Sequence, residues 1–203
     1  MTLALIDYGA GNLRSVENAL KAAGAPDVTV TADPDVVRGA DRIVLPGVGA
    51  FGACMGALSA LDGMIEALNE RVIAQAAPFL GICVGMQLMA DAGEEMGIYP
   101  GLGWIEGTVR HLPDVPGLKV PHMGWNDIVP ARTHPLIVPG EAYFLHSYAF
   151  DVADPSELIA TTDHGGPVTA AIGRDNMLGV QFHPEKSQAY GLALLARFLE
   201  WKP

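Results

Sequence analysis

The sequence predicts an α/β fold: a doubly wound, mostly parallel sheet with antiparallel strands added in the C-terminal half. In the first part of the 203 residues, short apolar runs alternate with helix-like segments, as in βαβ crossovers. Beyond Gly93 the helical periodicity disappears, and strand-like runs follow one another between Pro, Gly, Asp and Asn until Ser187. No repeat, low-complexity tract or linker interrupts the chain, so we expect a single domain over residues 1–203.

The parallel part is expected to alternate strands with helices. The strands are predicted at residues 3–6, 28–31, 42–45 and 78–82. The helices are predicted over 13–23, from 33, from 52 and over 62–75. The first helix repeats apolar residues at Leu13, Val16 and Leu20, and Gly24 ends it.

The later strands are expected to pair antiparallel, either at the edge of the parallel sheet or packed beside it. Their predicted positions are 102–109, 119–123, 143–146, 158–162, 168–172 and 178–182. A final helix is predicted over 187–201, with Ser187 as its N-cap. The apolar residues expected to bury this helix are Leu194, Leu195, Phe198 and Leu199.

Composition narrows the functional classes. Half of the residues are hydrophobic and 17% are charged, which is typical of a globular chain. The net charge of -11 argues against nucleic-acid binding, which needs a basic surface. Two cysteines are too few for the disulfide scaffold of a secreted protein. The N-terminus lacks a basic region, and no apolar run approaches the ~20 residues of a membrane span, so we expect a soluble cytoplasmic protein.

Cys83 is the first candidate catalytic residue. It lies at the end of the predicted strand 78–82, in the pattern Gly81-x-Cys83-x-Gly85. Glycines on both sides allow a sharp strand-to-helix turn that raises the thiol above the sheet edge, and a following helix N-terminus favours the thiolate. The alternative is a structural cysteine that packs as a small hydrophobic residue.

His183 and Glu185 are the candidate partners of that thiol. His183 follows an apolar strand, and Glu185 lies two residues further on, where its side chain projects to the same side. A carboxylate there orients the imidazole, which takes the proton of the thiol. The alternatives are a solvated loop whose glutamate serves the next helix, or a three-ligand zinc site.

Acyl transfer also requires donors for an oxyanion. The backbone N–H of Val84 is one candidate, because the residue after a nucleophile elbow donates there. The turn that contains Val48 and Gly49 follows another strand of the same sheet edge and is the second candidate. The alternative for that turn is a simple strand-to-helix connection. Gln87, one helical turn after Cys83, is a candidate for binding a polar substrate, or an ordinary helix residue.

Three motifs together resemble the class I, triad-type glutamine amidotransferases. They are Gly-Ile-Cys-Val-Gly-Met-Gln from Gly81, Gln-Phe-His-Pro-Glu from Gln181 and Pro-Gly-Val-Gly from Pro46. The resemblance spans nearly the whole chain and implies a flavodoxin-like fold. It further implies that Cys83 attacks the side-chain amide of L-glutamine, that His183 moves the protons and that Glu185 orients His183. No cofactor and no metal are implied.

Other segments resemble the glutaminase subunits of imidazole glycerol phosphate synthases, from histidine biosynthesis. They are Asp-Tyr-Gly-Ala-Gly-Asn from Asp7, Pro-His-Met-Gly-Trp-Asn from Pro121, Tyr-Phe-Leu-His-Ser-Tyr from Tyr143 and Pro-Glu-Lys-Ser from Pro184. This resemblance implies a heterodimer with a (β/α)₈-barrel synthase subunit. That partner joins the ammonia to a phosphoribulosyl aminoimidazole carboxamide nucleotide, giving imidazole glycerol phosphate and an aminoimidazole carboxamide ribotide.

The resemblance also assigns binding residues. The implied glutamine contacts are Gly49, Gln87, Ser147 and Tyr148. The implied contacts with the synthase are Asn12, Trp125 and Lys186. From the residues alone, Trp125 could equally pack in the core, and Ser147 could equally satisfy a strand end.

Two other functions stay open from the sequence. One is a triad amidotransferase or free-standing cysteine hydrolase that serves another reaction, against which the segment 121–126 argues. The other is a binding or regulatory module with a relic site. The sequence assigns Cys54 no role beyond packing.

Overall fold

The computed structural model describes all residues from 1 to 203. Its main sheet has nine strands in the order β2-β1-β3-β4-β13-β12-β11-β8-β9. The first five of these pair in parallel. They are β1 (Leu3–Ile6), β2 (Val28–Thr31), β3 (Arg42–Gly47), β4 (Phe79–Cys83) and β13 (Met177–Val180). The predicted doubly wound, mostly parallel arrangement of this part is confirmed.

The later strands adopt both of the positions expected from the sequence, at the edge of the parallel sheet and packed beside it. Four continue the main sheet: β12 (Pro167–Arg174), β11 (Leu158–Asp163), β8 (His122–Pro130) and β9 (Gly140–His146). Four others form a second sheet in the order β10-β7-β5-β6, whose outer pairs are antiparallel; its central pair, β7 and β5, is parallel, so the predicted antiparallel pairing was wrong there. These are β10 (Tyr148–Val152), β7 (Gly107–His111), β5 (Ala92–Glu94) and β6 (Ile98–Pro100).

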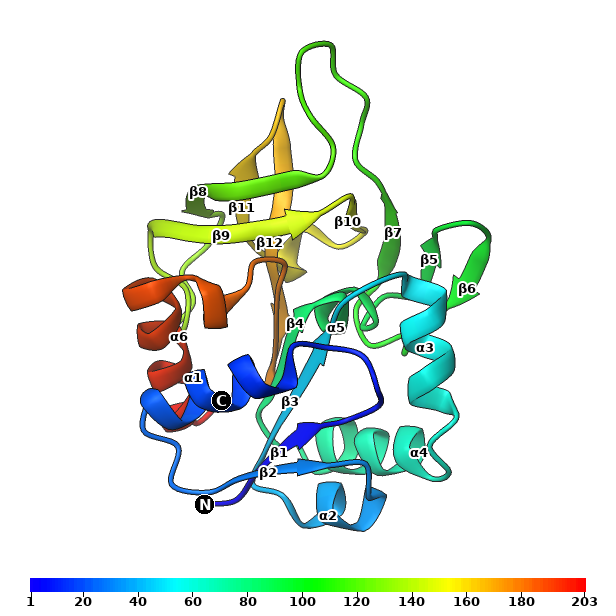
Figure 1. Ribbon diagram of the computed structural model, residues 1–203, viewed down its shortest axis with the longest axis vertical. Coiled ribbons are helices and arrows are strands. Elements are labelled where there is room, and N and C mark those ends of the chain that lie inside the picture. Colours follow the sequence, from blue (N-terminus) through cyan, green and yellow to red (C-terminus); the bar gives the residue numbers. More distant parts are fainter.

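Helices cover the parallel part of the sheet (Figure 1). The longer ones are α1 (Leu13–Ala22), α3 (Phe51–Ser59) and α6 (Gln188–Glu200). The shorter ones are α2 (Pro34–Gly39), α4 (Met64–Leu68) and α5 (Val84–Gln87). A π-helix, η1 (Asn69–Ala74), continues α4, and two 3₁₀ turns are η2 (Pro155–Glu157) and η3 (Pro184–Lys186). By length and apolar content no single helix could cross a membrane, and only the bent pair 51–59 and 64–74 passes that test.

The centre of the sheet explains why the local sequence reads as apolar runs. Every residue of β1, β3, β4 and β13 is buried. A parallel sheet covered on both faces needs such continuous apolar strands. These strands belong to a core cluster of 53 buried residues, to which α6 contributes the predicted Leu194, Leu195, Phe198 and Leu199.

Two strand predictions for the C-terminal part were wrong in extent, and three strands were missed. The strand predicted at 102–109 begins only at Gly107, because the backbone N–H groups of Leu102, Trp104 and Ile105 bond to carbonyls of residues 88 and 89 instead. The strand predicted at 119–123 is instead β8, which alternates exposed and less exposed residues up to Pro130. Strands β5, β6 and β10 were not predicted, since β5 and β6 have only three residues each and a single residue separates β10 from β9.

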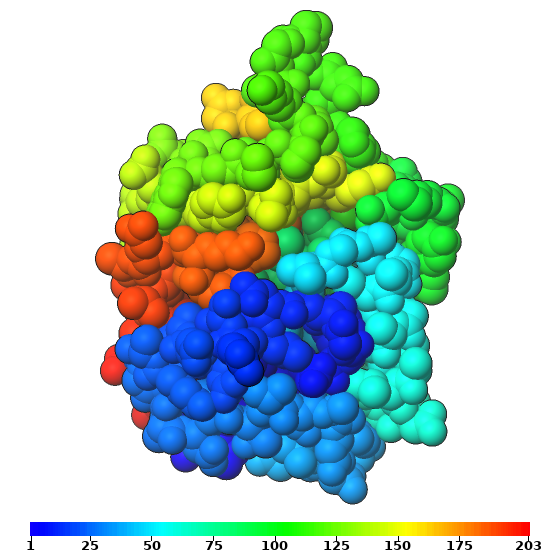
Figure 2. All heavy atoms as spheres, viewed as in Figure 1, coloured from blue at the N-terminus to red at the C-terminus, as the bar shows by residue number.

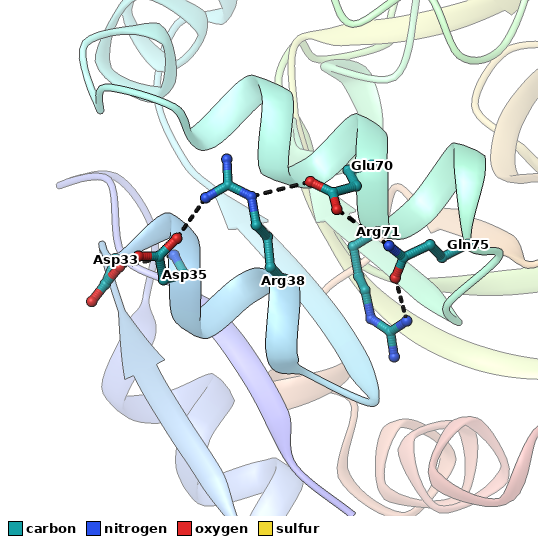
Figure 3. Close-up of polar contacts among 6 residues, drawn as sticks. All are labelled: Asp33, Asp35, Arg38, Glu70, Arg71 and Gln75. Atoms are coloured by element: carbon teal, nitrogen blue, oxygen red, sulfur yellow. Dashed lines mark hydrogen bonds and ion pairs between the residues drawn. The ribbon is translucent and has the colours of Figure 1, made fainter.

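A polar cluster joins α2 to η1 (Figure 3), and α2 lies at the end of the molecule opposite β8 (Figure 1). Arg38 contacts Asp35 at 2.6 Å and Glu70 at 3.1 Å. Glu70 accepts from Gln75, whose amide oxygen accepts from Arg71 at 2.9 Å. Exposed pairs of this kind contribute little stability each, so the cluster fixes how α2 lies against η1 rather than adding much to the core.

Candidate active site

Cys83 occupies a strained backbone position at the end of β4. Its φ is 54° and its ψ is -113°, a combination that non-glycine residues rarely adopt. Strain of this kind costs about 1–3 kcal/mol and persists where the surrounding fold enforces it, often at functional sites. The expected sharp turn is present, although the helix that follows, α5, has only four residues.

The flanking glycines allow the turn to close. A Cβ on Gly85 would lie 1.9 Å from the carbonyl oxygen of Leu45, and one on Gly81 would lie 2.7 Å from the carbonyl oxygen of Gly85. A Cβ on Gly47 would lie 2.6 Å from the backbone nitrogen of Gly85. The start of α5 therefore packs backbone to backbone against the end of β3, so that the turn containing Val48 lies beside the thiol.

His183 lies in the same pocket as Cys83 and is held by Glu185. The Nδ1–H of His183 donates to Oε1 of Glu185 at 2.9 Å, and both side chains are almost fully buried. Burial alone lowers the pKa of His183, but the Cys83 side chain and the Glu185 carboxylate outweigh it and raise that pKa to about 9. The imidazole is therefore poised to carry a positive charge beside the sulfur.

Strand β9 fixes the backbone around His183. The N–H of His183 donates to the carbonyl of Tyr143 at 2.9 Å. Ser187 accepts from the Tyr143 N–H at 2.9 Å and donates its hydroxyl to the His183 carbonyl at 2.7 Å. Ser187 stands at the predicted N-cap position of α6 but makes no side-chain cap bond. The prediction that it caps the helix was wrong, because the hydroxyl serves β9 and His183.

One pocket, with a volume of about 210 Å³, collects most of the predicted site residues. On the face drawn in Figure 2, segments near residues 50, 145 and 185 meet, in cyan, yellow and orange. The predicted residues that line the pocket are Val48, Gly49, Cys83, Val84, Gln87, Ser147, Tyr148, His183 and Lys186. Asn12 and Trp125 do not line it, and Glu185 lies behind His183.

Gln181 is a site residue that sequence reasoning missed. It is fully buried, and its Nε2 lies 3.7 Å from the Sγ of Cys83. Its Oε1 accepts from Gln87, and the same Gln87 nitrogen donates to the carbonyl of Tyr148 at 3.0 Å. A buried amide donor directed at sulfur stabilises a thiolate. The sequence signal was present, since Gln181 is a polar residue inside an apolar strand and begins the Gln-Phe-His-Pro-Glu motif, but neither feature by itself assigns this side chain a role.

Glu95 is a second residue that was missed. It stands between β5 and β6 and is the only carboxylate among the pocket-lining residues. Its Oε2 accepts from the backbone N–H of Phe51 at 2.7 Å, at the start of α3. Nothing in the local sequence distinguishes Glu95 from the neighbouring exposed acidic residue, so only the pairing of β5 with β6 reveals it.

Cys54, which was predicted only to pack, contacts the 46–49 turn that lies beside the thiol of Cys83. Its S–H donates to the carbonyl of Val48 at 3.3 Å, and burial raises the pKa of this thiol. Tyr8 donates to the carbonyl of Pro46 at 2.7 Å. Two buried side chains therefore hold the carbonyls of Pro46 and Val48 in the 46–49 turn.

The chain contains no group of three or more His, Cys, Asp or Glu side chains arranged to hold a metal ion. The zinc alternative for Cys83, His183 and Glu185 therefore has no geometric support. What the pocket does provide is a thiol, a protonatable imidazole held by a carboxylate, buried amide donors and the carboxylate of Glu95. This set is suited to attack on an amide carbonyl.

Of the three predicted partner residues, only Lys186 lines this pocket. Trp125 is 47% exposed, so the alternative that it packs in the core was wrong. Its ring lies 6.2 Å from that of Tyr143, and the Nζ of Lys186 lies 5.8 Å from the same Tyr143 ring. Asn12 precedes α1 and makes no side-chain cap bond to it.

Comparison with known proteins agrees with this chemistry. The family described as glutamine amidotransferase class-I matches residues 4–201. The imidazole glycerol phosphate synthase subunit HisH of Zymomonas mobilis subsp. mobilis is 64% identical, with 100% of this chain and 97% of that protein covered. The protein of the same name from Rhodospirillum rubrum is 56% identical over the full length of both chains. The structure of PurLQS from Thermotoga maritima is similar in fold, with a TM-score of 0.74, 17% identity and coverage of 98% and 97%.

Proposed function

The chain belongs to the class I glutamine amidotransferases, and from that premise we propose that it is the glutaminase subunit of an imidazole glycerol phosphate synthase in histidine biosynthesis. The relatives of that name, similar over the full length, carry this proposal. The substrate is L-glutamine, and the residues that act are Cys83, His183 and Glu185. The location we propose is the cytoplasm.

The first half of the reaction forms a thioester. The thiolate of Cys83 attacks the side-chain amide carbon, and the carbonyl oxygen becomes an oxyanion bound by backbone N–H groups of Val84 and of the Val48–Gly49 turn. The C–N bond then breaks, and the imidazolium of His183 gives its proton to the leaving nitrogen. Ammonia departs, and a γ-glutamyl thioester and a neutral imidazole remain.

The second half restores the enzyme. His183 takes a proton from water, and the resulting hydroxide attacks the thioester carbon. The C–S bond breaks, the new carboxyl group releases its proton to solvent as glutamate leaves, and the thiolate–imidazolium pair is present again. Glu185 keeps the same Nδ1–H bond throughout, so the ring presents its other nitrogen to the reacting atoms in both halves.

Substrate recognition requires groups for both ends of a zwitterion. We assign Gln87, Ser147 and Tyr148, together with Gly49, to the substrate backbone and amide, because all four line the pocket. Glu95 is the carboxylate available to pair with the α-ammonium group. Such a charge-assisted bond contributes about 1.5–3 kcal/mol.

We further propose that the synthase partner is a (β/α)₈ barrel that docks beside the pocket mouth. Strands β8 and β9 pair Met123 with Leu145 and Trp125 with Tyr143, so that the side chains of these four residues share one face. Met123 is 65% exposed and Leu145 is 37% exposed. An exposed apolar face of this kind, with Lys186 at its border, supports a protein contact through which ammonia is handed over.

The experiment is glutamate production by the full chain, with and without the barrel synthase subunit from the same source. Turnover is expected to rise when the two copurify, and Cys83→Ala should lower it ~10³-fold or more. Mass spectrometry after treatment with a diazo-ketone glutamine analogue should place the adduct on Cys83. Labelling of Cys54 instead, or a loss of less than about tenfold in Cys83→Ala, would reject the triad assignment.

A further inference from the structure

Two histidines on the inner face of β8 and β9 are not used by the mechanism above. His122 and His146 are a directly paired couple in the β8–β9 register, and they lie on the face opposite Trp125. They are 4% and 6% exposed. The Nδ1 of His122 lies 3.0 Å from the Nε2 of His146. Two buried imidazoles in contact need a defined proton on each ring, since like-charged or doubly unprotonated pairs would repel.

The hydrogen-bond partners on either side of the two rings determine which ring nitrogens carry the protons. The amide of Asn126 is oriented, because its oxygen accepts from the Asp127 N–H at 2.8 Å and its nitrogen donates to the Asp163 carbonyl at 2.8 Å. That nitrogen also lies 3.0 Å from the Nε2 of His122. The Nε2 of His122 must therefore accept, and the proton of this ring lies on Nδ1.

The second ring follows from the first. The Nδ1–H of His122 donates to the Nε2 of His146, so that nitrogen also accepts. The proton of His146 then lies on Nδ1, where it donates to the carbonyl of Tyr148 at 2.9 Å. All four ring nitrogens are occupied with one consistent direction, from Asn126 to Tyr148. A further proton on either ring would set one N–H group against another.

The series of hydrogen bonds that runs through His122 and His146 reaches the active site at the Tyr148 carbonyl. It also accepts the Gln87 amide, which bonds to Gln181, whose own amide faces the Cys83 sulfur at 3.7 Å. Tyr148 and Gln87 both line the pocket. A carbonyl held by two donors is fixed in direction, and so is the pocket edge to which it belongs.

We propose that His122 and His146 are positioning residues, which hold the Tyr148 carbonyl and the Gln87 amide at the glutamine pocket as a fixed pair of neutral Nδ1–H tautomers set by Asn126. Burial lowers the pKa of His122 to about 4 and that of His146 to about 3, which keeps both rings neutral. The titratable groups that face the pair are His164, stacked on His122 at 4.2 Å, and His183. The proposal deepens the proposed glutaminase function and rests on it.

The first test reads the tautomers directly, without turnover. The probe is long-range ¹H–¹⁵N correlation NMR of the histidine rings in the full chain. His122 and His146 should both show Nδ1–H at pH 7 and should not titrate down to about pH 5. His134 is the internal reference, because its Nδ1 accepts from the Leu136 N–H at 3.2 Å and its proton therefore lies on Nε2. A proton on the Nε2 of His122 or His146, or titration of either ring near pH 6.5, would overturn the proposal.

The second test separates the effect of the hydrogen-bond donor of His122 from the effect of its aromatic ring. His122→Phe keeps the stacking on Phe144 and His164 but removes the donor, whereas His122→Asn keeps an amide donor near the Nδ1 position and removes the ring. In the complex with the synthase, we expect His122→Phe to raise the KM for glutamine about threefold to tenfold, with kcat changed less than about twofold. His122→Asn should raise KM less. If the two variants raise KM equally, or if His122→Asn raises it more, the donor of His122 has no such role.

The two tests distinguish a failure of the proposed glutaminase function from a failure of the hydrogen-bond assignment. If the complex turns over no glutamine, the proposed function fails, while the tautomer spectrum of the wild-type chain still decides the hydrogen-bond assignment. If a His122 variant does not fold, that same wild-type spectrum is decisive.

Discussion

The side-chain amide of Gln181 donates to the sulfur of Cys83 at 3.7 Å, although 98 positions separate the two residues in the chain. The parallel pairing of β4 with β13 makes this contact, since Val180 stands beside Ile82 in the register and the next residues of both strands follow at the same edge. The thiol therefore has a buried donor in addition to the imidazole of His183.

Gln181→Leu should slow alkylation of Cys83 by iodoacetamide about tenfold at pH 7, because the thiolate loses a charge-assisted hydrogen bond. Gln181→Glu is the sharper variant. It keeps an acceptor for Gln87 but places a carboxylate beside the sulfur, which disfavours the thiolate further. The alkylation rate should be highest in the wild type, lower in Gln181→Leu and lowest in Gln181→Glu. If Gln181→Glu reacted as fast as the wild type, this role of Gln181 would be contradicted.

Glu185→Gln should change stability in a pH-dependent manner. His183 has a folded-state pKa raised to about 9, above its ordinary value near 6.5. A raised pKa means that the folded state binds the proton more tightly, so the stabilisation is complete below pH ~6.5 and is lost as pH rises through about 9. The gap in free energy of unfolding between the wild type and Glu185→Gln should therefore narrow from pH 6.5 to pH 9.5.

Urea denaturation at several pH values measures that gap. Glu141→Gln is the control, because Glu141 is exposed on β9 and forms no ion pair. Its effect on stability should not vary over the same range. A gap for Glu185→Gln that stays constant or widens towards alkaline pH would show that the carboxylate does not hold the imidazolium.

Glu95→Gln should raise the KM for glutamine about tenfold and leave kcat nearly unchanged, since the amide keeps the bond from the Phe51 N–H but loses the charge that pairs with the substrate ammonium. Glu94→Gln is the matched control, because the neighbouring Glu94 is exposed and pairs with Arg110 at 3.4 Å. Steady-state kinetics of the complex compares the two variants. Similar KM values for both would remove Glu95 from the binding site.

Gly85→Ala should prevent the chain from folding into the native structure, because the new Cβ would lie 1.9 Å from a carbonyl oxygen of the neighbouring strand and a backbone atom cannot move aside. Gly56→Ala is the opposite case. Gly56 lies in α3 with no atom within 4 Å of the added Cβ, so the substitution should stabilise the protein by about 0.5–1 kcal/mol. Thermal unfolding of both variants measures the contrast, and a stable Gly85→Ala protein would show that the elbow can open.

The local sequence was sufficient for the parallel strands and for the nucleophile turn. Strands such as β3 and β4 are buried on both faces, so they appear as short apolar runs with glycine at their ends. Gly81 and Gly85 mark Cys83 because a sharp turn at a crowded sheet edge leaves no space for a side chain on either flank. The pair His183 and Glu185 was also visible, since two residues in an extended segment project to one side.

The amino-acid sequence by itself therefore determined the α/β class, the strained turn at Cys83 and the imidazole–carboxylate pair, because each depends on residues within a few positions of one another. Only the tertiary structure decided that Gln181 faces the thiol, that Glu95 enters the pocket and that His122 meets His146. Those contacts depend on the register between strands and on the path of a hairpin, and the free energy that sets a register is spread over many side chains far apart in the chain.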